Sequence, residues 1–273
     1  MALLFTKYHN CHEADVTECN IVISEGTFAN FGNHVNLTRW LHIPSVNLWP
    51  QSIYSRLSKG TSGRYLVAFG DSFTAGGDSK SYPHIAAGLL NWQVRNFAVG
   101  GAKTHNIFAQ LINGGTVLPL ATHVVLTISG NDVDGIGKLV NIARVNVTAF
   151  EEQCTKLKPT LVSTYKQIKG AVRAETKIYA LPYVDFISVG NRVPYEYESH
   201  KILQILNKLV EDAAAEANIY YVATVVSAFL GHEMYSSDPY IDDFQHPTNA
   251  VHPNLKGYAK IGEVLAAYLQ VNS

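Results

Sequence analysis

The chain has 273 residues, a formal net charge of −1, 47% apolar residues and 16% charged residues. This length and composition indicate one sizeable folded domain, alone or with an appendage, and exclude a disordered chain. The near balance of charge, without a basic run, argues against a nucleic-acid-binding protein. No apolar stretch approaches the roughly 20 residues of a membrane-spanning helix, so we expect no transmembrane segment.

Cysteine usage places few constraints on the fold. The sequence contains three cysteines, Cys11, Cys19 and Cys154. They are too few for a disulfide framework, although one bridge between Cys11 and Cys19 would leave Cys154 free. Histidines flank Cys11, but the paired short spacings typical of structural zinc sites are missing, so we expect no metal. The N-terminus has no charged region before its short apolar run and is a poor signal peptide, which leaves the compartment open.

The sequence divides best near residue 63. Residues 1–63 show weak periodicity and end in a loop rich in glycine and serine. A separate domain of this size would be marginally stable, so we interpret 1–63 as an N-terminal extension packed on a main domain of residues 64–273.

The main domain alternates predicted strands and helices. Short apolar runs predict strands at 65–69, 94–99, 123–128, 177–181 and 219–223. Helical patterns cover 82–90, 104–112, 149–173, 199–217 and 255–269. This alternation predicts an α/β fold, a three-layer sandwich with helices on both faces of a parallel sheet of about five strands. Ligands bind beyond the carboxyl ends of such strands, so reactive residues belong in the loops that follow them.

The first of these loops spans residues 70–77, Gly-Asp-Ser-Phe-Thr-Ala-Gly-Gly. Its flanking glycines allow Ser72 to project from the strand end, and N–H groups of the following turn can face an oxyanion. The alternative is a phosphate-binding loop, but neither G-x-x-x-x-G-K-[ST] nor G-x-G-x-x-G is present.

Three further residues are candidates for the site. Gly101 lies in a Gly-Gly turn after the second strand, where the alternative is a simple tight turn. Asn131 follows the third strand and offers an uncharged amide donor, although it could instead cap a turn. His252 comes just before the last helix, where Pro253 restricts its backbone; the alternative is an ordinary surface or packing histidine.

Together the four segments resemble the motifs of the SGNH hydrolase (GDSL esterase/lipase) family, in its order and spacing, over roughly residues 64–273. The resemblance implies a flavodoxin-like α/β/α fold and hydrolysis of carboxylic esters or thioesters without a metal or other cofactor. It also implies roles for single residues: Ser72 as nucleophile, His252 as base, and an oxyanion hole formed by Ser72, Gly101 and Asn131. Phe73 stands where the family name has leucine.

The last segment departs from the family pattern. The family places an aspartate three residues before the histidine, and this chain has Asn249 there. Asp243 and His246 give a second D-x-x-H spacing, but the residues after His252 fit the family better. Three interpretations of His252 remain: Asn249 or a nearby backbone carbonyl orients it, Asp242 or Asp243 supplies the acid, or the enzyme is weakened.

These observations lead to three functional hypotheses. The first is a serine esterase that hydrolyses acetyl or short-chain esters of small molecules through an acyl-enzyme on Ser72. The second is a catalytically weakened relative that binds an acyl or glycan ligand. The third is a flavodoxin-like nucleotide binder, which the missing phosphate loop disfavours. The sequence leaves the oligomeric state open.

Overall fold

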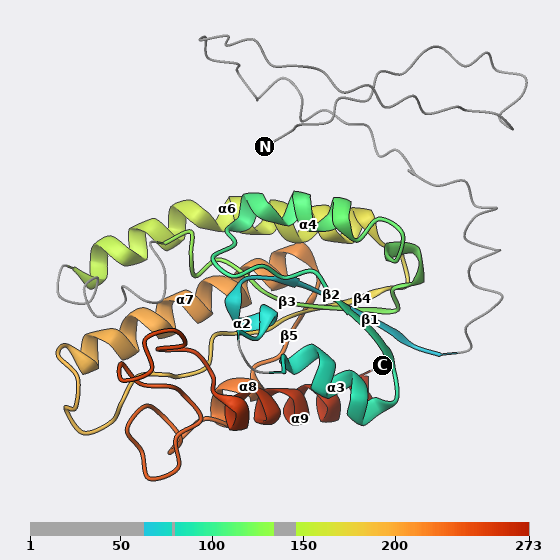
Figure 1. Ribbon diagram of the computed structural model, residues 1–273. Coiled ribbons are helices and arrows are strands. Elements are labelled where there is room, and N and C mark those ends of the chain that lie inside the picture. Colours follow the sequence, from blue (N-terminus) through green and yellow to red (C-terminus); the bar gives the residue numbers. More distant parts are fainter. Residues whose placement is uncertain (1–62, 78–79, 134–145, 273) are drawn as a thin grey trace, which may run out of the picture. The chain divides into compact units, whose positions relative to one another are not determined.

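The computed structural model describes residues 63–77, 80–133 and 146–272 (Figure 1). Residues 1–62, nearly all of the predicted N-terminal extension, lie outside the described residues. The bridge considered between Cys11 and Cys19 lies there as well. Cys154 is described, and it is buried and free.

In the described residues, five strands form one sheet. They are β1 (Tyr65–Gly70), β2 (Gln93–Asn96), β3 (His123–Thr127), β4 (Lys177–Ala180) and β5 (Tyr220–Tyr221), in the order β2-β1-β3-β4-β5. Every neighbouring pair is parallel, which confirms the predicted sheet. The chain moves from β1 outward to β2 and then back past β1 to β3. The strand order therefore reverses between β1 and β3, where open α/β sheets bind their ligands.

Helices cover both faces of this sheet. They are α2 (Ser72–Ala75), α3 (Tyr82–Leu90), α4 (Ile107–Asn113), α6 (Val147–Ala171), α7 (Glu196–Ala217), α8 (Thr224–Ser227) and α9 (Leu255–Asn272), with 3₁₀ helices η3 (Thr104–Asn106) and η4 (Leu118–Leu120). In Figure 1, α4 and α6 lie on one face and α3 and α9 on the other, and α7 packs against α6. This arrangement confirms the three-layer fold. None of these described helices combines the length and apolar character that a membrane crossing requires.

Some elements differ from their predicted bounds. The second strand, predicted over 94–99, ends at Asn96, although the N–H groups of Phe97 and Val99 still donate to the carbonyls of Ala68 and Gly70 in β1. The helix predicted over 104–112 is divided into η3 and α4. Helices α2 and α8 have four residues each, too few for a periodic pattern to reveal them.

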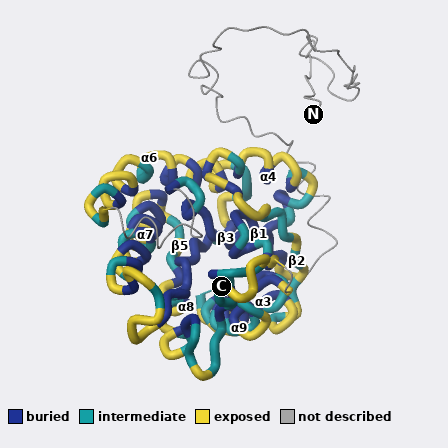
Figure 2. The backbone as a smooth tube through the Cα atoms, turned by 60° about the vertical axis from the view of Figure 1, so that its left-hand side comes forward, coloured by how far each residue is buried: buried dark blue, intermediate teal, exposed yellow. Residues whose placement is uncertain are grey.

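The central strands are buried along their whole length. Every residue of β1 and of β3 is buried, and Figure 2 shows these strands as dark segments inside the molecule. A strand covered on both faces needs a continuous apolar run rather than an alternating one, as the sequence of β1 has.

Gly70 allows the last residues of β1 to lie close against β3. Its φ is +125°, and a Cβ at this position would lie 2.1 Å from the carbonyl oxygen of Thr127. The side chain of Gln110 holds Gly70 from the other side, accepting from its N–H at 2.7 Å and donating to its carbonyl at 2.8 Å. A residue with a side chain would push the strands apart here, at the entrance to the Ser72 loop.

A buried histidine lies at the opposite end of β3. The ring of His123 lies against the tilted ring of Trp92 and stacks on the ring of Tyr179, with centroid distances of 4.5 and 6.0 Å. Burial, together with the nearby charges of Arg64 and Lys177, lowers the pKa of His123 to about 4. The folded protein therefore keeps His123 neutral, while an unfolded chain protonates it near pH 6.5.

This difference predicts a loss of stability in acid. Because the pKa of His123 is lowered by folding, its contribution to stability is complete above pH 6.5 and is lost as pH falls towards 4. Between pH 7 and 4.5, wild type is expected to lose about 1–2 kcal/mol more free energy of unfolding than His123→Phe. Urea denaturation at several pH values measures this, with the exposed His105→Asn as control. If the free energy of unfolding fell equally with pH in wild type and in His123→Phe, the lowered pKa of His123 would be contradicted.

Candidate active site

The loop after β1 places a serine at the start of a helix. Ser72 is the first residue of α2, and the side chain of Asp71 caps that helix by accepting the N–H of Phe73 at 3.0 Å. Gly76 ends the helix with φ +97°. Ser72 is half-buried, so the turn holds the residue without enclosing it completely.

The structure brings together Ser72 and His252, which are 180 residues apart in sequence. The distance from Ser72 Oγ to His252 Nε2 is 2.7 Å. The ring of Phe73 packs beside the imidazole, with 5.1 Å between centroids. Asp242 donates its backbone N–H to the carbonyl of His252 at 3.0 Å. Val251, just before the histidine, has φ +62°, an unfavourable value for a β-branched residue that the surrounding contacts must maintain.

A backbone carbonyl orients the imidazole. His252 Nδ1 lies 2.9 Å from the carbonyl oxygen of Ala250. A carbonyl only accepts hydrogen bonds, so Nδ1 carries the proton. In neutral imidazole this leaves Nε2 as an acceptor, directed at the Ser72 hydroxyl, which is the tautomer that a general base requires.

The surroundings of His252 favour its neutral form. Burial lowers the pKa of the imidazole, and this effect outweighs the opposite effects of the Ala250 carbonyl, the Asn249 backbone and the Asp242 charge. Its pKa therefore lies below the ordinary value of 6.5. At neutral pH the ring is unprotonated and able to accept a proton.

The side chains considered as third members of a triad bond elsewhere. Asn249 donates from Nδ2 to Asp242 Oδ2 at 2.7 Å and to the carbonyl of Pro253 at 3.2 Å. Asp243 bonds to the exposed His246, with 2.9 Å between Oδ1 and Nδ1. Of Asn249 and Asp243, only Asn249 is hydrogen-bonded to His252, and it is so through its backbone. The carbonyl of Asn249 accepts the backbone N–H of His252 at 3.0 Å.

The loops after β2 and β3 border the serine. A Cβ built on Gly100 would lie 4.0 Å from the Cβ of Ser72, and Gly101 has φ +76°. Asn131 donates one amide hydrogen to the carbonyl of Ala102 at 3.0 Å, which leaves its second hydrogen available. Within the part of the chain that the structure describes, no hydrogen bond takes up the backbone N–H of Ser72 or Gly101. These groups are suited to binding an oxyanion.

Two side chains that the sequence did not reveal as important hold these loops in place. Asp132 accepts the N–H of Thr104 at 3.0 Å and its hydroxyl at 2.7 Å, joining the loops after β2 and β3. Asn96 donates to the carbonyl of Thr74 at 2.7 Å and so joins the loop after β2 to α2. Both residues stand at or just beyond a strand end, which is the signal that could have revealed them.

A buried carboxyl group lies beneath the serine. Asp71 Oδ1 accepts the Phe73 N–H and the Thr127 hydroxyl, both at 3.0 Å, and Oδ2 accepts the hydroxyl of Tyr183 at 2.5 Å. Burial raises the pKa of Asp71 to about 6, although these three hydrogen bonds act in the opposite direction. Through these three hydrogen bonds, Asp71 fixes the backbone next to Ser72.

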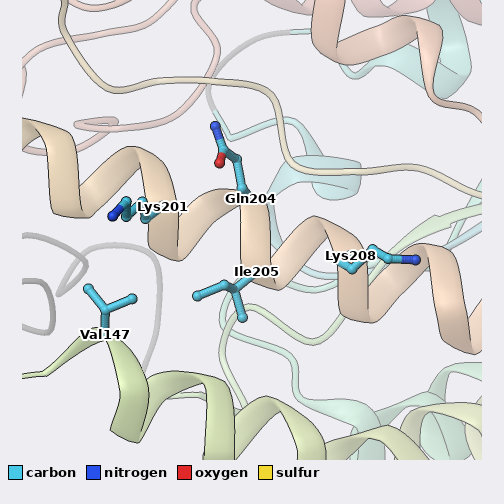
Figure 3. A pocket seen from close by; sticks show the side chains of 5 residues that line it. All are labelled: Val147, Lys201, Gln204, Ile205 and Lys208. Atoms are coloured by element: carbon cyan, nitrogen blue, oxygen red, sulfur yellow. The ribbon is translucent and has the colours of Figure 1, made fainter.

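A hollow of about 350 Å³, open to solvent, lies along α7 beside the first residue of α6 (Figure 3). Its walls are formed by Val147, Lys201, Gln204, Ile205 and Lys208. These side chains include no nucleophile–base pair, so the candidate chemistry stays with the strand-end loops. Across residues 63–77, 80–133 and 146–272, no three His, Cys, Asp or Glu side chains are grouped so that they could hold a metal ion.

The contacts of Asn249 make the outcome of one substitution predictable. In Asn249→Asp, a carboxylate would face the Asp242 carboxylate and the Pro253 carbonyl where an amide now donates to both. We expect a loss of about 1–2 kcal/mol in the free energy of unfolding and no gain in kcat. Urea denaturation and ester hydrolysis measure the two effects.

The matched control is the exchange Asp242→Asn with Asn249→Asp, which restores an amide opposite a carboxylate. This double variant is expected to recover most of the lost stability. A rise in kcat for Asn249→Asp alone would contradict the account, because it would mean that a carboxylate at 249 reaches the imidazole.

Comparison with known structures supports the fold. The chain is similar to phospholipase A1 from Streptomyces albidoflavus NA297, with a TM-score of 0.64 and 21% identity over 76% of this chain and 99% of that one. It is similar to an extracellular lipase from Streptomyces rimosus, with a TM-score of 0.62 and 22% identity over 76% and 99%. It is also similar to the lipase Lip_vut3 from a goat rumen metagenome, with a TM-score of 0.57 and 18% identity over 75% of this chain and 96% of that one.

A search of curated protein sequences found no match. The model of the GDSL-like lipase/acylhydrolase family matches residues 68–260, a span that begins inside β1 and includes both Ser72 and His252. The chain thus belongs to the GDSL-like lipase/acylhydrolase family.

Proposed function

We propose that the protein is a serine esterase that hydrolyses carboxylic esters through an acyl-enzyme on Ser72. The observation that carries this proposal is the 2.7 Å distance between Ser72 Oγ and the unprotonated Nε2 of His252. A hydroxyl in contact with an oriented, neutral imidazole is an activated nucleophile. A protein that only binds an acyl or glycan ligand has no use for this contact.

Acylation begins when Ser72 Oγ attacks the carbonyl carbon of the ester. A carbon–oxygen bond forms, and the hydroxyl proton moves to His252 Nε2. The former carbonyl oxygen becomes an oxyanion, which receives hydrogen bonds from the backbone N–H groups of Ser72 and Gly101 and from the Asn131 amide. The tetrahedral intermediate then collapses, its bond to the alcohol oxygen breaks, and His252 returns the proton to the departing alcohol.

Deacylation repeats these steps with water. His252 accepts a proton from a water molecule as the water oxygen attacks the acyl carbon, and the same donors bind the second oxyanion. Collapse breaks the bond to Ser72 Oγ, which regains its proton from His252, and the carboxylic acid leaves. The imidazolium formed in each half-reaction is stabilised by the Ala250 carbonyl and by the more distant charge of Asp242.

The acyl group that we expect is short. The sequence has no long apolar segment suited to a lid over a lipid-binding site, so we expect acetyl and short-chain esters to react faster than long-chain ones. The family alone does not decide this, because one fold serves many substrates.

Hydrolysis of p-nitrophenyl acetate, butyrate and longer esters tests the proposal. Wild type is expected to hydrolyse the short esters fastest, and Ser72→Ala to lose on the order of 10⁴-fold or more in kcat with unchanged thermal stability. Ser227→Ala, a change at an exposed serine, is the matched control and is expected to behave as wild type. Undiminished activity in Ser72→Ala would overturn the proposal.

A further inference from the structure

Tyr183 lies between two of the loops that form the site, those after β1 and β3. It follows β4 and is fully buried. Its hydroxyl donates to Asp71 Oδ2 at 2.5 Å and accepts the backbone N–H of Gly130 at 2.7 Å. Asp71 directly precedes Ser72, and Gly130 directly precedes Asn131. One oxygen atom therefore joins the nucleophile loop to the oxyanion loop.

We propose that Tyr183 is a positioning residue that fixes the Ser72 loop relative to the Asn131 loop, and thereby aligns nucleophile and oxyanion donor. This inference rests on the proposed esterase function. Tyr183 acts through its neighbours, and its hydroxyl has both of its usual roles, donor and acceptor, already occupied.

The tyrosine is itself held rigidly enough for this role. Asn207, in α7, forms two hydrogen bonds with the Tyr183 backbone. Its side chain accepts the Tyr183 N–H at 2.9 Å and donates to the Tyr183 carbonyl at 2.8 Å. The ring also packs edge-on against Phe73, with 5.1 Å between centroids and 83° between planes. Phe73 in turn touches the imidazole of His252. The position of the hydroxyl is thus set by the layer of helices as well as by the sheet.

Alignment of this kind acts on the rate of the chemical step. Oxyanion donors stabilise the transition state only when they point at the place where the charge develops. A displacement of about 1 Å between reacting groups costs on the order of 100-fold in rate. Loss of the Tyr183 hydroxyl would remove this link between the two loops while leaving the exposed surface unchanged, so kcat should fall more than KM rises.

Ionisable groups near the contact between Tyr183 and Asp71 make the cost of removing the Tyr183 hydroxyl dependent on pH. Two kinds of ionisable group face Asp71: the Asp132 carboxylate and the phenols of Tyr82, Tyr165, Tyr183 and Tyr258. Burial raises the pKa of each of these phenols, so they stay neutral in the range of the test. Asp71, whose pKa is about 6, changes charge there. A hydrogen bond to its ionised form is stronger, so removing the hydroxyl costs more above pH 6 than below it.

The test compares Tyr183→Phe with Tyr179→Phe. Tyr179 is equally buried and lies in β4, but its hydroxyl donates at 3.4 Å to the carbonyl of Asn272, at the end of α9. With p-nitrophenyl acetate we expect Tyr183→Phe to lose about 10- to 100-fold in kcat, with less than about a threefold change in KM. Tyr179→Phe should stay within about threefold of wild type in both constants.

Two further measurements do not depend on activity. The fall in melting temperature caused by Tyr183→Phe should be larger at pH 8 than at pH 4.5, whereas that of Tyr179→Phe should be the same at both. The amide proton of Gly130, followed by NMR, should shift with the ionisation of Asp71 in wild type and in Tyr179→Phe, and lose that response in Tyr183→Phe.

The outcomes separate this inference from the proposed function. If wild type hydrolyses no ester, the proposed function fails, and the stability and NMR measurements still decide whether Tyr183 joins the two loops. Equal kcat for the two tyrosine variants in an active protein would overturn the positioning role. Equal losses of melting temperature at both pH values, or a Gly130 response that survives in Tyr183→Phe, would overturn the linkage itself.

Discussion

The geometry of the site depends on the close approach of β1 and β3 at Gly70. Only glycine fits there, because a Cβ would lie 2.1 Å from the carbonyl oxygen of Thr127. The same approach brings the Thr127 hydroxyl within 3.0 Å of Asp71, so the buried carboxyl group and the serine after it are fixed to both strands. The serine therefore stands where the strand order reverses, the position at which open α/β sheets bind ligands.

Among the described residues, no side-chain carboxylate is hydrogen-bonded to the imidazole of His252. In a serine protease built around an aspartate, loss of that aspartate costs about 10⁴ in turnover, mainly because the histidine then takes the wrong tautomer. Here the Ala250 carbonyl selects the tautomer by geometry alone. It stabilises the imidazolium less than an anion would, but the low pKa of His252 keeps the base unprotonated at neutral pH. The Asn249 side chain supports the loop through Asp242 and Pro253 instead.

The sequence predicted the sheet and the loops because both rest on local patterns. Buried apolar runs revealed β1 and β3, and the strand-end rule pointed to Ser72 and Asn131. A backbone carbonyl near Asn249 was one of three interpretations of what orients His252, but the sequence could not single out Ala250, because a backbone carbonyl is the same at every residue. The contact between Asp71 and Tyr183 was equally hidden, since it joins residues 112 apart and depends on side-chain direction within the folded core.

Covalent labelling tests most directly whether His252 activates Ser72. Diisopropyl fluorophosphate phosphorylates an activated serine as fluoride leaves, and mass spectrometry of the digested protein locates the adduct. We expect one adduct per chain, on the peptide that contains Ser72, formed at a rate that falls to background in His252→Ala. An adduct on another residue, or labelling of Ser72 at an unchanged rate in His252→Ala, would contradict the activation of Ser72 by His252.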